Sequence, residues 1–248
     1  PTGGQSVSHN TKITVGSTPV PHGEILAQIK PLLAAKGIDL NVVEFTDYVK
    51  PNLALNDKEI DANFFQHQPY MDKFNAEHGT NLVALCKVHI EPMGIYSRKI
   101  TSREQLPDGA KVAIPSDPTN GGRALLILQK AGLISLKDGG SISSTVQDIV
   151  KNDKHLQFVE LEAAQIPRSL EDVDIALINT NFALEAGLNP LKDALFIEDK
   201  DSPYANILAV RAGDENRPEI KELQQALQSP EVKKFIEDKY QGAILASF

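Results

Sequence analysis

Hydrophobic and polar positions follow two alternating periods along this chain. Residues 12–16 and 40–45 are short apolar runs with the β-branched composition of strands. Between them, residues 22–36 place apolar side chains at spacings of one, four, seven and eight, which predicts an amphipathic helix. Pro31 lies inside this helix and should kink or break it. Strand, helix and strand in this order form a βαβ unit, which favours a parallel sheet.

The same alternation of elements continues to the C-terminus and predicts an α/β protein. Further strands are expected at 61–65, 82–97, 111–115, 157–161, 174–178, 195–197 and 207–210, with Pro92 interrupting the second of them. Further helices are expected at 51–56, 69–78, 101–106, 119–131, 144–152, 166–170, 181–186, 218–229 and 230–240.

A second α/β pattern begins at residue 111, so we expect two lobes. Lobe 1 should comprise residues 12–96 and 204–248, and lobe 2 residues 97–203. Each would be a mixed, mostly parallel sheet flanked by helices, as in periplasmic binding proteins, with the ligand cleft between the lobes. Residues 1–11 are polar and carry two glycines, so they are interpreted as a tether.

Composition narrows the function classes. The 248 residues are 41% hydrophobic and 23% charged, which is ordinary for a globular protein. The net charge is −8 and the basic residues are scattered, which argues against nucleic acid as the main partner. No apolar run approaches the roughly 18 residues of a membrane span. Cys86 is the one cysteine and stands in an apolar run, so a buried thiol is expected.

The strongest candidate for chemistry is the segment 116–125, which follows a strand and opens a helix. The N-terminus of a helix carries a partial positive charge, which favours anions and disfavours cations. Arg123 nevertheless stands in the first turn of this predicted helix. Arg123 should therefore have an anionic partner, and its planar fork suits a carboxylate. The alternative is a solvated arginine behind an ordinary cap at Asn120 or Thr119. No Gly-Lys-Ser/Thr sequence supports a phosphate loop.

Three other segments carry candidate ligand groups. Residues 64–70 combine three aromatic rings, a histidine and two amides, and alternation lets only one of Phe64 and Phe65 face a cleft. His89 and Glu91 form a pair that could hold a metal or a proton, but no clustered ligand spacing supports a metal, and a pocket wall or structural histidine is favoured. Asparagines stand at predicted strand ends, at 179 and 181 after the strand 174–178 and at 206 before the strand 207–210, where turn chemistry is the simpler explanation.

Taken together, these segments resemble the NlpA family of methionine-binding lipoproteins of ABC importers. The similarity runs from about Lys12 to the C-terminus. It rests on the ordered motifs at 44–52, 61–67, 69–70, 115–120, 122–125 and 178–181. The segment 204–206 departs from the family pattern at Ala205, where valine is expected.

The resemblance implies two lobes that close on methionine or a close relative of it. By motif, Arg123 and Asn120 should hold the ligand carboxylate, and Asn181 and Asn206 the amino end. The thioether should be surrounded by aromatic and histidine side chains, namely Tyr48, Phe65, His67, His89 and Tyr96. No metal or cofactor is implied, and polarisable thioethers contact aromatic rings favourably.

The resemblance further implies an exported, lipid-anchored protein whose partners are an ABC permease and its ATPase subunits. The signal peptide and the lipidated cysteine would lie upstream of Pro1. The alternatives are an enzyme on the same scaffold, which would need a nucleophile–base pair or a metal, and a sensor domain, which would need a DNA-binding motif; neither feature is evident in the sequence, so a non-enzymatic binding protein is expected. L-methionine, D-methionine and a methionine dipeptide are not separated by the sequence.

Overall fold

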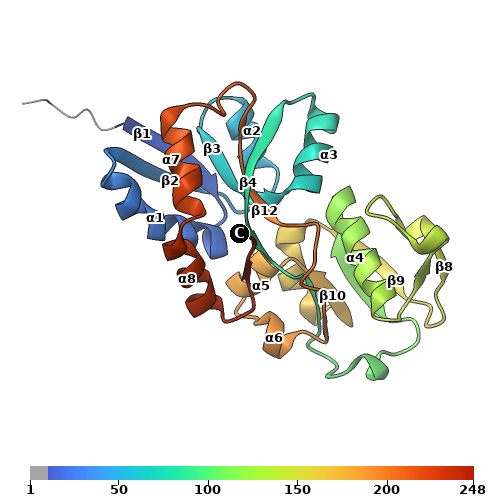
Figure 1. Cartoon of the computed structure of the whole chain (residues 1–248). Coiled ribbons are helices and arrows are strands. Elements are labelled where there is room, and N and C mark those ends of the chain that lie inside the picture. The colour runs from blue at the N-terminus through green and yellow to red at the C-terminus, as the bar shows by residue number, and fades with distance from the viewer. Residues whose placement is uncertain (1–10) are drawn as a thin grey trace, which may run out of the picture.

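The computed structural model describes residues 11–248, which form two α/β lobes lying side by side (Figure 1). The first lobe is built on a six-stranded sheet with the strand order β13-β4-β12-β3-β1-β2. Its strands are β1 (Thr11–Ser17), β2 (Ile38–Glu44), β3 (Ala62–His67), β4 (Leu82–Ile90), β12 (Asn206–Arg211) and β13 (Leu245–Ala246). β1 pairs in parallel with β2 and β3, as the βαβ pattern predicts, whereas β12 runs antiparallel between β3 and β4.

Helices from both ends of the chain cover this sheet. They are α1 (Glu24–Ala34), α2 (Lys50–Asn56), α3 (Gln68–His78), α7 (Pro218–Leu227) and α8 (Pro230–Tyr240). The apolar stripe of α1 packs with α7 and α8, and the three helices share one buried cluster with β1 and β3. The C-terminal helices therefore belong to the first lobe, as the sequence predicts.

The second lobe is built on a five-stranded sheet with the order β11-β5-β10-β6-β9. Its strands are β5 (Gly94–Tyr96), β6 (Lys111–Pro115), β9 (Gln157–Leu161), β10 (Ile175–Ile178) and β11 (Phe196–Ile197). The helices are α4 (Pro118–Lys130), α5 (Thr180–Glu185) and α6 (Pro190–Asp193), and a two-stranded ribbon joins β7 (Ser135–Leu136) to β8 (Ile149–Lys151). β6 is parallel to β9 and β10, while β5 is antiparallel to β10.

Two segments carry the chain between the lobes. The first lies between the end of β4 at Ile90 and the start of β5 at Gly94, and the second lies between β11 and β12. The sequence places the boundary between the lobes at residues 96 and 97. The strand pairing places it before β5, because β5 belongs to the second sheet. Thr11, assigned by the sequence to the tether, is the first residue of β1, and the rest of the tether lies outside the described residues.

α1 runs through Pro31 to Ala34, so this proline does not break the helix. Two other local predictions were wrong. Residues 144–152 do not form a helix but a capped turn at Val146–Asp148 followed by strand β8. Cys86 is a free thiol that is only half-buried, and burial raises its pKa to about 11. Within residues 11–248 no helix has the length and apolarity needed to cross a membrane.

Candidate functional site

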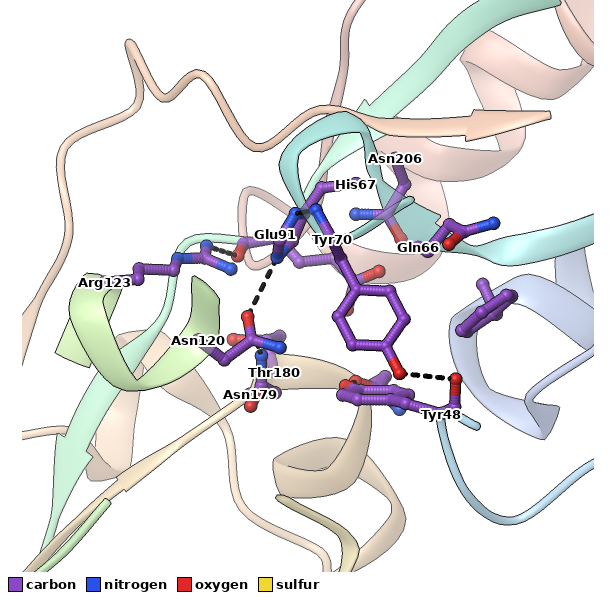
Figure 2. A pocket seen from close by; sticks show the side chains of 12 residues that line it. Tyr48, Gln66, His67, Tyr70, Glu91, Asn120, Arg123, Asn179, Thr180 and Asn206 are labelled. Carbon is purple, nitrogen blue, oxygen red and sulfur yellow. Dashed lines mark hydrogen bonds between the residues drawn. The ribbon is translucent and has the colours of Figure 1, made fainter. Parts of the chain in front are cut away.

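A small cavity lies between the two lobes, close to the segments that join them (Figure 2). Small-molecule sites are often found at such boundaries between domains. The cavity is lined by Tyr48, Phe65, Gln66, His67, Tyr70, Glu91, Asn120, Arg123, Asn179, Thr180, Asn181 and Asn206. Both lobes contribute to this wall, and so does the first joining segment, through Glu91.

His67 connects the two lobes across the cavity. It is the N-cap of α3, and its Nδ1 accepts the backbone N–H of Tyr70 at 3.1 Å. Nε2 must then carry the proton, and it donates to Oδ1 of Asn120 in α4 at 2.8 Å (Figure 2). Burial, reinforced by the charge of Arg123, lowers the pKa of His67 to about 3. The ring is therefore neutral at neutral pH and has defined donor and acceptor atoms.

Arg123 is buried in the first turns of α4 and does have an anionic partner, but that partner belongs to the protein. Its Nε and Nη2 atoms donate to the carboxylate of Glu198 at 2.9 and 2.5 Å. Nη2 also donates to the backbone carbonyl of Glu91, and the guanidinium lies 4.2 Å from the centre of the Tyr204 ring. The solvated alternative is excluded, because the side chain is only 4% exposed. Arg123 thus contacts both segments that join the lobes.

The loop after β2 reaches across the cavity through Tyr48. Its hydroxyl donates to Oδ1 of Asn181 at the start of α5, and its ring packs against Phe182 with centroids 4.8 Å apart. Nδ2 of Asn181 is buried and has no partner among the described residues. Oδ1 of Asn179 is likewise buried without a partner. These two atoms are a free donor and a free acceptor on the cavity wall.

Glu91 brings a buried carboxylate to the cavity from the first joining segment. Nε2 of His89 donates to its Oε2 at 2.8 Å, and Nε2 of His22 lies 3.1 Å from the same atom. Burial alone would raise the pKa of Glu91, but the two histidines outweigh it and hold the pKa well below its usual range. Oε1 forms no hydrogen bond to a described residue, so it is the oxygen available to a ligand.

Glu91 and its two histidines are also the set of side chains in residues 11–248 with metal-ligand geometry. Their potential ligand atoms lie within 4.8 Å of one another, and all three side chains are buried. Hydrogen bonding already accounts for these contacts, because both Nε2 atoms meet a carboxylate oxygen.

The structure brings most of the predicted ligand residues together. Tyr48, Phe65, His67, Asn120, Arg123, Asn181 and Asn206 line the cavity, and Phe64 faces the core as strand alternation requires. His89 and Tyr96 do not line it. His89 lies behind Glu91, and Tyr96 packs with Ala176 and Phe182 in the core of the second lobe.

Five lining residues were missed by the sequence analysis, namely Gln66, Tyr70, Glu91, Asn179 and Thr180. All of them stand in segments that the sequence singled out. The choice within each segment failed because it depends on which way a side chain points at the end of a strand. Gln66, for example, faces the buried amides of Asn52 and Asn63 and hydrogen-bonds to both.

A wider groove lies outside the cavity and shares Tyr48 and Tyr70 with it. The hydroxyl of Tyr70 donates to the backbone carbonyl of Tyr48 at 2.7 Å (Figure 2). The rings of Tyr48, Phe65 and Tyr70 contact one another, with centroids about 6 Å apart. These aromatic rings form the apolar end of the cavity and separate it from the groove.

Comparison with known proteins gives a consistent family. A family model described as NlpA lipoprotein matches residues 13–248. The D-methionine-binding lipoprotein MetQ of Salmonella typhi is 52% identical over 198 residues, which cover 79% of this chain and 73% of the relative. Lipoprotein 28 of Escherichia coli K12 is 45% identical over 241 residues, 96% of this chain and 89% of the relative.

Solved structures agree with these relatives. A nutrient-binding protein from Burkholderia cenocepacia bound to methionine superposes with a TM-score of 0.92 at 48% identity, covering 95% of this chain and all of that one. A structure described as the methionine-binding protein MetQ has a TM-score of 0.91 at 43% identity, covering 96% of this chain and 98% of that one.

Proposed function

The chain belongs to the NlpA lipoprotein family, and from this premise we propose that it is a solute-binding protein that captures methionine for an ABC importer. One observation of the cavity carries the proposal. A buried guanidinium, Arg123, and a buried carboxylate, Glu91, line a single small cavity whose far end is aromatic. An α-amino acid with an apolar side chain carries the matching groups in the same arrangement.

Glu91 is the proposed partner of the ligand ammonium group. Its carboxylate is ionised, and Oε1 is not engaged by any described residue. The free acceptor Oδ1 of Asn179 can contribute a second hydrogen bond. A charge-assisted hydrogen bond in a buried site is stronger than a neutral one.

The ligand carboxylate is proposed to bind to Arg123 and to the amide groups of Asn181 and Asn206. Glu198 occupies Nε and Nη2 of Arg123, which leaves Nη1 for the ligand. Oδ1 of Asn181 is occupied by Tyr48, and Oδ1 of Asn206 by His22. Both asparagines therefore offer N–H donors, which suit a carboxylate better than the amino end expected from the family motif.

The thioether is proposed to lie against Tyr48, Phe65 and Tyr70. Sulfur contacts with aromatic rings contribute about 0.3–1.5 kcal/mol each, and the thioether needs no hydrogen-bond partner. Asn120 is proposed to support the site through its bond to His67.

The fuller physiological picture is also a proposal. The lipoprotein relatives support an exported, membrane-anchored protein, and the methionine-binding relatives support delivery to an ABC permease driven by its ATPase subunits. Binding without conversion is proposed, and mass spectrometry should recover unchanged methionine after incubation with the protein.

Thermal unfolding tests the proposal. A ligand at one hundred times its Kd stabilises the folded state by about 2.7 kcal/mol, so L- or D-methionine should raise the melting temperature clearly. Leucine tests the need for the thioether, and glutamate tests the apolar end of the cavity. Equal shifts with methionine, leucine and glutamate would contradict the assignment.

A further inference from the structure

We propose that His22, which does not line the cavity, is the positioning residue that orients two of its ligand-facing groups, Glu91 and Asn206. The inference rests on the proposed function, since its effect is measured as methionine binding. His22 lies in the turn Pro19–Gly23 before α1, and its side chain is fully buried. Glu91 lies on the first segment that joins the lobes, and Asn206 begins β12 directly after the second segment; both are drawn on the cavity wall in Figure 2.

A single nitrogen atom makes both contacts. Nε2 of His22 is 2.7 Å from Oδ1 of Asn206, a residue 184 positions later in the chain, and 3.1 Å from Oε2 of Glu91. The carboxylate oxygen can only accept a hydrogen bond, so Nε2 must carry the proton. Nδ1 meets the hydroxyl of Thr18 at 2.8 Å, which fixes the plane of the ring.

These contacts decide what the cavity presents to a ligand. The Nε2 proton holds Oδ1 of Asn206 away from the cavity. Nδ2 of this amide donates to the backbone carbonyl of Tyr204 at 3.5 Å, so its second N–H is the donor left for the ligand. Attraction to Oε2 of Glu91, shared with His89, leaves Oε1 as the free oxygen of that carboxylate. Loss of His22 would leave both oxygens without this donor and let each side chain turn.

The surroundings of His22 allow its hydrogen bonds to be separated from its packing. Its ring stands edge-on to Phe64 with centroids 4.8 Å apart, and the ring of His89 lies 5.0 Å away. A phenylalanine at this position keeps an aromatic ring of similar size and removes every N–H group. Glutamine keeps a donor and loses the ring.

Calorimetric titration with L-methionine tests the assignment. His22→Phe should weaken binding by about ten- to a hundredfold, the usual result of leaving buried polar partners unpaired. His22→Gln should recover part of the loss. The exposed His155 serves as the control, and His155→Phe should bind like the wild type. Wild-type affinity in a folded His22→Phe protein would overturn the proposal, whereas failure of the wild type to bind methionine would instead overturn the proposed function.

A double-mutant cycle distinguishes positioning from general structural support. The cycle compares the fold-loss of methionine affinity in His22→Phe, in Asn206→Ala and in the double variant. If His22 acts through Asn206, the fold-loss in the double variant should be at least about threefold smaller than the product of the two single fold-losses. Strictly multiplicative losses would overturn the proposal.

If His22→Phe fails to fold, nitrogen-15 NMR of the wild type still decides the matter. The proposal requires a proton on Nε2 of His22, and a tautomer with Nε2 bare would overturn it.

Discussion

The residues of this site act through atoms whose hydrogen-bonding roles are already fixed. His67 illustrates this, because Nδ1 accepts a backbone N–H of α3 and Nε2 donates to Asn120. A second proton could only be placed on Nδ1, where it would break the cap of α3. Burial adds to this penalty, and the pKa of about 3 follows from both. The hydrogen bonds that this ring forms therefore depend on its tautomer rather than on its charge.

The depressed pKa of His67 predicts a stability that falls in acid. Between pH 6.5 and about 3 the unfolded chain binds a proton at this residue that the folded chain does not. The free energy of unfolding should therefore decrease as the pH falls, by up to about 1.4 kcal/mol per pH unit for this group. Urea denaturation between pH 4 and 7 should show a shallower slope for His67→Gln than for the wild type.

Two observations complete that test. His89 also has a lowered pKa, so the slope should decrease in His67→Gln without disappearing. An unchanged slope in His67→Gln would mean that the neutral state of this ring contributes nothing to the pH dependence.

Glu91 predicts a second residue-level effect, on affinity. Glu91→Gln keeps the shape of the side chain but removes the charge proposed to hold the ligand ammonium. Removing the charge of one partner in a buried charged pair costs about 2–5 kcal/mol, or roughly one and a half to three and a half decades of Kd. Titration with 4-(methylsulfanyl)butanoate, which lacks the amino group, should show weak binding that the substitution hardly changes.

The matched control for this substitution is Glu77→Gln, in an exposed surface ion pair with Lys73. Glu77→Gln should leave the affinities for methionine and for 4-(methylsulfanyl)butanoate unchanged. Equal losses for methionine and for the desamino compound in Glu91→Gln would assign the ammonium group to another partner.

At the scale of the element, α4 shows how closely the backbone must approach to build the site. Asp117 caps the helix, and Pro118 begins it, which are ordinary helix-start residues. Gly122 is unusual, because a Cβ atom there would lie 1.8 Å from the backbone carbonyl oxygen of Ile142. The neighbouring loop therefore lies directly against the turn of the helix that carries Arg123.

This contact predicts that Gly122→Ala destabilises the protein. The obstacle is backbone and cannot rotate away, so a loss of about 1–3 kcal/mol, or more, is expected. Gly23→Ala is the matched control, since Gly23 has helical dihedral angles and an added Cβ would meet only ordinary contacts, the nearest at 3.5 Å. Gly23→Ala should be neutral or stabilising by up to about 1 kcal/mol. Chemical denaturation should measure the free energy of unfolding of both variants, and equal values for Gly122→Ala and Gly23→Ala would contradict this prediction.

Most elements could be predicted from periodicity and caps, and the exceptions have physical causes. Residues 144–152 carry a genuine helix-start signal, because Thr145 and Asp148 form a capping box. The β-branched residues Ile149 and Val150 then begin strand β8, which pairs with β7 through Ile149 and Lys151, so strand pairing outweighs the local signal.

The site was predictable at the level of segments, and less so at the level of atoms. Family motifs led to Arg123 and Asn206, but the pairing of Arg123 with Glu198 joins residues 75 positions apart. The contact of His22 with Asn206 spans still more of the chain. Neither pairing has a local signature, so sequence patterns could not identify what these side chains contact.

At the scale of the whole molecule, the cavity walls belong to different lobes that contact each other directly. Tyr48 of the first lobe bonds to Asn181 of the second, and His67 of the first bonds to Asn120 of the second. The covalent links between the lobes are confined to the two joining segments near Glu91 and Tyr204. This arrangement suits a hinge, with the interlobe hydrogen bonds made in the closed form.

Solution scattering tests the hinge. Protein freed of ligand by partial unfolding and refolding should have a larger radius of gyration than the same protein saturated with methionine, because the interlobe bonds no longer hold the closed form. Mass spectrometry should first verify that the sample is free of ligand. Superimposable curves from verified free and saturated samples would argue against lobe closure.

The position of β12 in the middle of the first sheet has a consequence for the order in which the protein acquires its structure. The second sheet is assembled from one continuous stretch, β5 to β11, whereas the first sheet needs β12 to fill the place between β3 and β4. A chain that grows from its N-terminus has made more than 200 residues before that strand exists. Until then, β3 and β4 present unpaired edges, which are prone to wrong pairing. The nascent first lobe is therefore the part of this protein most in need of protection while it folds.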